Sequence, residues 1–205
     1  MKKIYLLALI CSFSVCTFAQ LDKGKILLGG TIGAEYNRKK IESYNDKSSY
    51  FIISPEAGKF YKNNRLIGVG FSVGINKPDS SYHVNNYGVK TYLRQYFPLG
   101  KSFFFFAEEG LKFSYYRYIL GSDIIIQHNT SVYLKPGLTF EVNPRFQVEV
   151  ALSPLATLAY DHSRTKVSNT NSGRLNSTSN GVSLYTNTDR SFLGDLAIGL
   201  RWVLK

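Results

Sequence analysis

The chain has 205 residues, with 25 basic and 14 acidic side chains and a formal net charge of +11. This length suits one domain and excludes a multidomain machine. The abundance of Tyr, Phe and Gly, with a single Met, favours strands over a helical bundle or a disordered chain. Both cysteines, Cys11 and Cys16, lie in the first twenty residues, so we expect the processed chain to hold no disulfide, thiolate metal site or cysteine nucleophile.

The N-terminal segment has the pattern of an export signal. Lys2 and Lys3 precede an apolar run over residues 4–15, and Thr17-Phe18-Ala19 places small residues where a signal peptidase reads them. The run is too short to span a bilayer as a helix. We predict a signal peptide over residues 1–19 and one mature domain over residues 20–205.

Eight segments with a hydrophobic period of two follow one another from residue 25 onward. This period is typical of strands that have one apolar face. The segments are Lys25–Tyr36, Ser48–Tyr61, Leu66–Asn76, Asn86–Phe97, Ser102–Tyr116, Asn129–Val142, Phe146–Tyr160 and Ser191–Leu204.

The connections between these segments alternate in length. They are short and turn-like at residues 62–65, 98–101 and 143–145, and longer and polar elsewhere, with Asp161 to Arg190 as the longest. Short periplasmic turns and longer outer loops are typical of membrane barrels. We therefore predict an all-β fold, an eight-stranded antiparallel up-and-down transmembrane β-barrel, in the outer membrane of a Gram-negative bacterium.

The two faces of each predicted strand differ in a way that favours a membrane barrel over a soluble one. In the third segment Ile67, Val69 and Phe71 alternate with small residues, which include Gly68 and Gly70. A lumen enclosed by eight strands has room only for side chains that fill it. We expect the bulky set to face lipid and the small and ionic set to face the lumen.

Strand parity assigns five acids and five bases to the inner face. A buried charge is tolerated when it is paired and hydrogen-bonded. We therefore predict an ion-pair network that fills the lumen and leaves no open pore; the alternative is solvated charge on the surface of a soluble sandwich. The assigned residues are Glu35, Glu56, Lys90, Arg94, Glu108, Lys112, Lys135, Glu149, Asp195 and Arg201.

A few residues do not fit this pattern. Glu109 follows Glu108, so one of the two carboxylates points outward unless a bulge near Ala107 changes the parity, or the residue lies near the membrane interface. Proline removes a donor from the strand ladder, and we expect local bulges at the prolines inside predicted strands. These prolines are Pro55, Pro136 and Pro154.

The residues that could carry catalysis or metal binding form no convincing set. His83, His128 and His162 lie in or beside predicted loops and lack metal-ligand spacing, so we expect no metal and no cofactor. Asp161-His162-Ser163 has the residue types of a hydrolase triad, but neighbouring side chains on an extended strand point to opposite faces. We therefore expect no enzyme activity, with a lipid A-modifying barrel enzyme as an alternative.

The basic residues are spread along the chain, which together with the export signal argues against a nucleic-acid partner. One compact cluster, Arg38, Lys39 and Lys40, lies in the first predicted loop. Ammonium and guanidinium groups pair well with phosphate, so this cluster could contact lipopolysaccharide; the alternative is a solvated loop.

Four short motifs carry a family resemblance over residues 25–205. They are Leu28-Gly29-Gly30-Thr31-Ile32-Gly33, Ile53-Ser54-Pro55-Glu56-Ala57-Gly58, Leu93-Arg94-Gln95-Tyr96-Phe97-Pro98-Leu99 and Leu196-Ala197-Ile198-Gly199-Leu200-Arg201-Trp202. The chain resembles the small eight-stranded outer-membrane β-barrel family, which includes the OmpA transmembrane domain, OmpX and the PorT-like barrel domains. The resemblance implies outer-membrane lipid, lipopolysaccharide and the barrel-assembly machinery as partners. Members usually end in an aromatic residue that this machinery recognises, whereas this chain ends Trp202-Val203-Leu204-Lys205.

Fold alone does not supply a function. We expect a structural or surface-interaction role through the outer segments Asn37–Lys47 and Asp161–Arg190. A narrow channel for small solutes is the alternative, followed by the lipid-modifying enzyme.

Overall fold

The computed structural model describes residues 21–41, 44–78, 82–120, 123–169, 173–186 and 197–204, so the predicted signal peptide lies outside the described residues. No helix in this part of the chain is long and apolar enough to cross a membrane. Its strands are β1 (Ile26–Ile41), β2 (Tyr44–Lys62), β3 (Arg65–Pro78), β4 (Tyr82–Pro98), β5 (Phe103–Leu120), β6 (Asp123–Asn143), β7 (Phe146–Ala151), β8 (Ala156–Asn169), β9 (Gly173–Thr186) and β10 (Ala197–Leu204).

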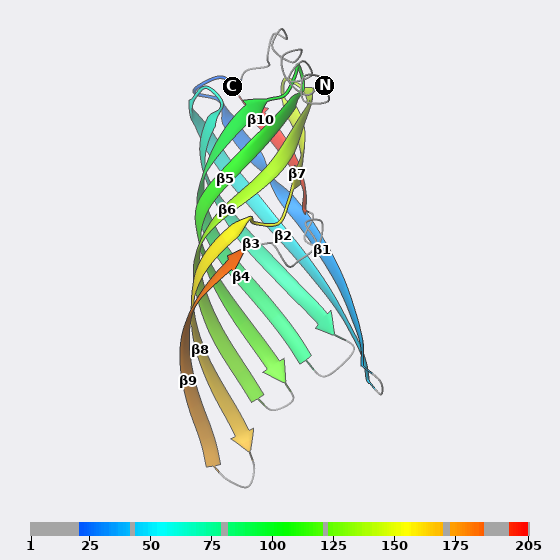
Figure 1. Ribbon diagram of the computed structural model, residues 1–205, viewed down its shortest axis with the longest axis vertical. Coiled ribbons are helices and arrows are strands. Elements are labelled where there is room, and N and C mark those ends of the chain that lie inside the picture. The colour runs from blue at the N-terminus through cyan, green and yellow to red at the C-terminus, as the bar shows by residue number, and fades with distance from the viewer. Residues whose placement is uncertain are drawn as a thin grey trace, which may run out of the picture.

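The strands form a closed antiparallel barrel (Figure 1). Neighbours follow the order β5-β4-β3-β2-β1-β10-β7-β6, and β6 pairs back with β5 to close the ring of eight. The strands β7 and β8 pair with successive parts of β6, and β8 also pairs with β9. The pairs β7/β8 and β9/β10 therefore serve as the seventh and eighth strands, which confirms the predicted fold class.

The seventh strand is interrupted between β7 and β8, where Pro154 lies. Its pairing register with β6 differs by two residues on the two sides of this break, which is a bulge of the kind predicted at that proline. Pro136 lies opposite, where the partner of β6 changes from β7 to β8, and its carbonyl oxygen accepts a hydrogen bond of 3.1 Å from the Leu152 N–H. Pro55 keeps the register of β2 unchanged, so the bulge predicted there is wrong; the proline only leaves a gap in the ladder to β3.

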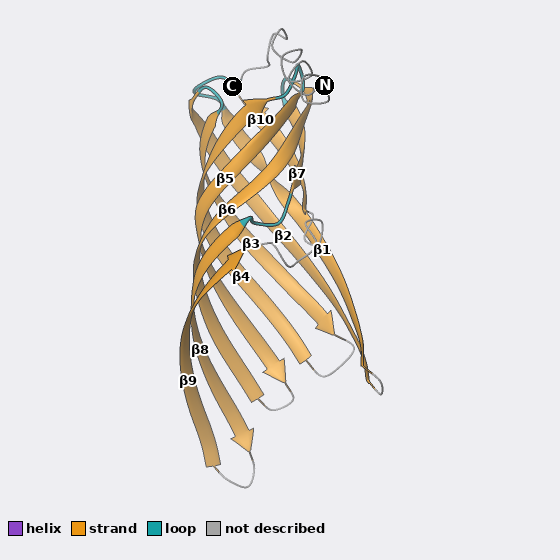
Figure 2. Ribbon diagram, viewed as in Figure 1, coloured by secondary structure: helices purple, strands orange, loops and turns teal. Residues whose placement is uncertain are grey.

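One end of the barrel has short turns and the other has long hairpins. The predicted short turns are confirmed at residues 63–64, 99–102 and 144–145. The predicted long loops are wrong: Asn37–Lys47 belongs mostly to β1 and β2, and most of the segment from Asp161 to Arg190 belongs to β8 and β9. Figure 2 shows these strands continuing to the far end of the molecule. Both faces of a strand meet water beyond the membrane, so the backbone pairs without any alternation of apolar residues.

The outer face of the barrel is apolar, as predicted. On β3 the side chains of Ile67 and Val69 are 52% and 55% exposed, whereas the inward Ser72 is buried. Two rows of outward rings bound this face, and we call the zone between them the lipid belt. The row at the short-turn end contains Phe97, Phe103, Phe105, Phe140, Phe146 and Trp202, and the row toward the hairpins contains Tyr87, Tyr115, His128 and His162.

The spacing of the two rows matches a membrane. On β5, Phe103 and Tyr115 are twelve positions apart, which for tilted strands corresponds to roughly 27–33 Å along the barrel axis. The apolar band of outer-membrane barrels is about 25 Å tall, with aromatic girdles at both interfaces.

The histidines expected in or beside loops lie on strands instead: His83 on β4, His128 on β6 and His162 on β8.

Apolar side chains fill the lumen at the short-turn end. They are fully or almost fully buried and come from several strands: Leu27, Phe60, Leu66, Tyr96, Phe104, Phe106 and Val203. Leu21 joins this layer from the segment that precedes β1, where its N–H donates to the Asn64 side-chain oxygen at 2.8 Å. The short-turn end therefore contains a packed apolar core.

A lysine placed in the lipid belt tests the orientation of the faces. Val69→Lys is expected to lower the free energy of unfolding in lipid vesicles by about 2–4 kcal/mol, because a cation then faces hydrocarbon. Thr178→Lys, on the exposed part of β9 beyond the ring row, is the control and should change it by less than about 0.5 kcal/mol. Urea titration in vesicles measures both. Equal small effects would mean that Val69 faces water.

Candidate functional site in the barrel lumen

Six charged side chains form a closed cycle of ion pairs inside the barrel, which we call the ion-pair ring. Acids and bases alternate around it, so each carboxylate lies between two cations. Its members, in order, are Glu56 of β2, Arg201 of β10, Glu149 of β7, Arg94 of β4, Glu108 of β5 and Lys90 of β4.

The two arginines connect the carboxylates of three strands, β2, β7 and β5. Arg201 Nη2 donates to Glu56 Oε2 and Arg201 Nε donates to Glu149 Oε2, both at 2.9 Å. Arg94 donates from Nη1 to Glu149 Oε1 at 2.6 Å and from Nε to Glu108 Oε2 at 3.0 Å. Lys90 Nζ closes the cycle, 3.2 Å from Glu108 Oε1 and 2.8 Å from Glu56 Oε1. The ring thus connects β4 directly to β7, which is not its neighbour in the sheet.

The ring is almost completely shielded from solvent. Glu108, Glu149 and Arg201 are 0% exposed, and Arg94 is 2% exposed. Desolvation of so many charges is tolerated only when good geometry and additional hydrogen bonds accompany the pairing. Two tyrosines supply such bonds: Tyr133 donates to Glu108 Oε1 at 2.8 Å, and the Tyr96 hydroxyl accepts from Arg94 Nη1 at 3.0 Å.

Neighbouring residues create the space for the arginines. A Cβ atom at Gly29, the partner of Arg201 in the β1–β10 register, would lie only 2.8 Å from Arg201 Cδ, so glycine is required for this close approach. The Arg94 guanidinium carbon lies 4.3 Å from the centroid of the Phe106 ring, in cation–π contact. The ion-pair ring therefore packs against the apolar layer at the short-turn end.

The structure brings together seven of the ten side chains that the sequence assigned to the lumen. Six form the ion-pair ring, and Lys135 Nζ lies 3.5 Å from Glu108 Oε1. Lys112 also lies on the inner face but forms no ion pair with any described residue. Glu35 lies on β1 with its side chain outside the described part, and Asp195 lies outside the described residues altogether.

Sequence reasoning missed the two tyrosines that bond to the ring. Tyr96 and Tyr133 share the inward parity of Arg94 and Lys135 on their own strands, so the signal was present. The prediction assigned only charged side chains to the lumen, so it left out these neutral hydroxyl groups.

The basic cluster predicted to contact phosphate lies on a strand and not in a loop. Arg38, Lys39 and Lys40 belong to the outer part of β1, opposite residues 47, 46 and 45 of β2. Their side chains lie outside the described part, so their contact with phosphate remains a prediction.

The residues Asp161, His162 and Ser163 do not form a catalytic triad. Asp161 Oδ1 accepts hydrogen bonds of 2.8 Å from the side chains of Gln127 and Asn129. His162 Nδ1 instead lies 2.7 Å from Asn180 Oδ1, on the opposite face of β8. Within the described ranges, no three His, Cys, Asp or Glu side chains are grouped to hold a metal ion.

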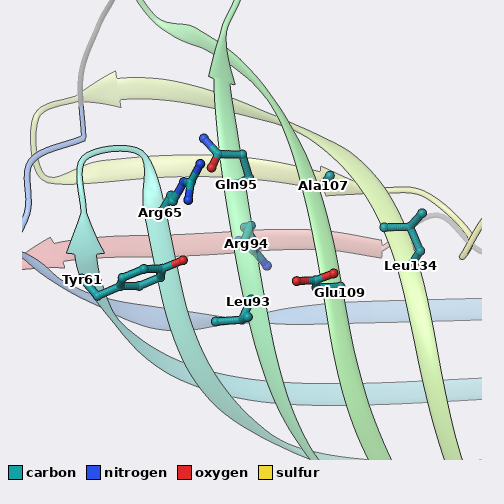
Figure 3. Close-up of a pocket in the computed structure, with 8 residues that line it drawn as sticks. All are labelled: Tyr61, Arg65, Leu93, Arg94, Gln95, Ala107, Glu109 and Leu134. Carbon is teal, nitrogen blue, oxygen red and sulfur yellow. The ribbon is translucent and has the colours of Figure 1, made fainter.

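Glu109 is exposed on the outer wall. The bulge predicted near Ala107 is absent, because β5 pairs continuously with both β4 and β6 through this region. Glu109 lies between Leu93 and Leu134 in these registers, about halfway between the two aromatic rows of β5. It lines a shallow pocket of about 240 Å³ in the wall, together with Tyr61, Arg65 and Gln95 (Figure 3).

An apolar belt around a closed antiparallel barrel, with charges buried in the lumen, defines the fold of a small eight-stranded outer-membrane β-barrel. No protein-family model and no curated protein matches the sequence. Among solved structures, the chain is similar to Neisserial surface protein A (NspA), with 14% identity and a TM-score of 0.53 over 90% of this chain and 98% of that one. It is also similar to the outer membrane protein OprG from Pseudomonas aeruginosa, with 9% identity and a TM-score of 0.56 over 89% and 97% of the two chains. These likenesses support the fold that the sequence predicted.

Two adjacent glutamates give a matched test of the ring. Glu108→Gln is expected to lower the free energy of unfolding by about 3–5 kcal/mol, because it leaves buried cations uncompensated. Glu109→Gln should leave that free energy unchanged or raise it slightly, since it removes a carboxylate from the lipid belt. Urea unfolding in vesicles measures both variants. If the two variants are equally destabilised, the assignment of the two faces is incorrect.

Proposed function

We propose that this protein is an integral outer-membrane barrel with a non-conducting lumen, and that it acts through the hairpins that extend beyond the lipid belt. The ion-pair ring is the observation that carries the proposal. It crosses the lumen next to the packed apolar layer, on the hairpin side of that layer. Both layers together occupy the cross-section of a barrel that is only eight strands wide. An open path for ions would require buried charges to separate, at a cost of several kcal/mol for each ion.

The lengths of the strands support a role for the hairpins. A tilted strand of about 9–11 residues is enough to cross a bilayer. β6 has 21 residues and β2 has 19, so both extend well beyond the lipid belt on the hairpin side. Small barrels place short turns in the periplasm, which assigns the hairpins to the cell surface.

The composition of the hairpins suits contact with the polar part of the envelope. The outer part of β1 carries Arg38, Lys39 and Lys40, whose charges are complementary to the phosphates of lipopolysaccharide. β9 is rich in Ser, Thr and Asn, with residues 177–180 all exposed. We propose that these surfaces bind envelope lipids or a surface partner.

Two other functions fit the fold less well. A narrow solute channel requires a continuous path, which the ion-pair ring opposes. A lipid A-modifying enzyme requires a nucleophile oriented by a base, and the separation of Asp161 from His162 across the strand gives no support for one at this site.

The non-conducting lumen has a direct electrical test. The purified protein in planar bilayers should give no stable single-channel steps. The double variant Arg94→Ala/Arg201→Ala removes the two bridging cations but leaves the apolar layer in place, so it should give at most brief openings. Stable steps from the unmodified protein would refute the filled lumen and favour the solute channel.

Contact with lipopolysaccharide is tested by removing the basic cluster. The triple variant Arg38→Gln/Lys39→Gln/Lys40→Gln should bind purified lipopolysaccharide at least about tenfold more weakly at low salt, because each basic residue near an anionic surface contributes about 1 kcal/mol. The control Lys23→Gln/Lys62→Gln/Arg65→Gln removes the same charge from the short-turn end and should bind normally. Thermophoresis in detergent measures the affinities. Equal loss in both variants would indicate attraction by net charge alone.

A further inference from the structure

A cavity of about 350 Å³ lies in the lumen on the hairpin side of the ion-pair ring. Its lining includes three lysines, Lys90, Lys112 and Lys135, together with Ser131 and Asn129. The volume falls within the range of sites for small molecules. No acidic residue is among its lining residues, although the ring carboxylates lie immediately beside it.

The charges around this cavity do not balance. The ion-pair ring contains three acids and three bases, so it is neutral by itself. Lys112 and Lys135 are additional to it, and only Lys135 reaches a carboxylate, at 3.5 Å from Glu108. The described residues of this layer therefore carry a net charge of +2.

The position of Lys112 lowers the stability of the fold. It lies directly opposite Lys90 in the β4–β5 register, and like charges in this position destabilise a sheet. Its neighbour on the other side is Ser131 of β6, which provides a hydroxyl group but no negative charge. Nothing in the described part of the chain forms an ion pair with the Lys112 ammonium group.

We propose that this cavity is a binding site for a small oxyanion of the phosphate type, with Lys112 as its principal cation. Lysine ammonium groups bind phosphate as point charges. Lys90 and Lys135 flank the site, and Ser131 provides a neutral hydroxyl donor. Asn129 Nδ2 donates one N–H to Asp161 Oδ1 and keeps a second for the ligand. Because the ring closes the short-turn side, the ligand enters and leaves from the hairpin side, so the site binds the anion without passing it through the barrel.

Inorganic phosphate is the probe for the first experiment. Backbone amide shifts of the isotopically labelled full chain in micelles are followed by NMR during a phosphate titration at constant ionic strength, set with sodium chloride. Saturable shifts are expected at residues 90, 112 and 131. Repeating the titration with glycerol phosphate separates the sources: tighter binding of the ester indicates an organic phosphate, and weaker binding indicates the free ion.

Three variants and a control identify the cation. Lys112→Met should weaken phosphate binding at least tenfold, whereas Lys112→Arg should retain most of it. Ser131→Asp places a carboxylate opposite Lys112, so it should abolish binding while raising the resistance to urea. Lys101→Met removes the same charge from the β4–β5 turn and should bind like the unmodified protein.

The site is refuted if the shifts rise linearly without saturation, or if chloride alone produces them. Unchanged binding in Ser131→Asp would also overturn it, and this variant keeps the test decisive if Lys112→Met fails to fold. The conductance of the barrel is measured separately, so failure of this proposal leaves the non-conducting lumen unaffected.

Discussion

Alternation of side chains in a narrow barrel is the constraint on which this structure depends. Every second residue of each strand must enter a lumen that has little room for water. Charged residues in those positions are costly unless they are paired, and the ion-pair ring pairs six of them. The ring joins residues far apart in the chain, such as Arg201 and Glu56, which are 145 positions apart. Its pairs therefore help to specify which strands close the barrel.

The lumen is organised in layers along the barrel axis. Apolar side chains around Phe60 and Phe104 fill the short-turn end, the ion-pair ring follows, and the lysine-lined cavity lies beyond it. Farther toward the hairpins, Asp161 accepts hydrogen bonds from Gln127 and Asn129. Polarity thus increases toward the hairpins, which is consistent with a barrel that is closed at one end and binds small ions at the other.

The two similar structures illustrate how little sequence this fold requires. Identities of 14% and 9% accompany coverage of 90% and 89% of the chain, so the fold is shared while most individual residues are not. Functional differences between such barrels must then lie in positions that the pattern leaves free. In this protein those positions include the long hairpins, the surplus Lys112 and the lipid-facing Glu109.

The period-two pattern by itself determined the fold class, the short turns and the direction in which residues such as Arg94 and Glu149 point, because burial of one face forces that pattern on each strand. It could not determine how far the strands continue, since strands that extend beyond the membrane need no alternation of apolar residues. Parity also could not select the ion-pair partners, because it assigned ten charged residues to one lumen without pairing them. Only the register and the closure of the barrel bring Arg94 to Glu149. They also leave Lys112 without an acid among the described residues. Pairing depends on distance across the barrel, and that distance exists only after the strands have closed.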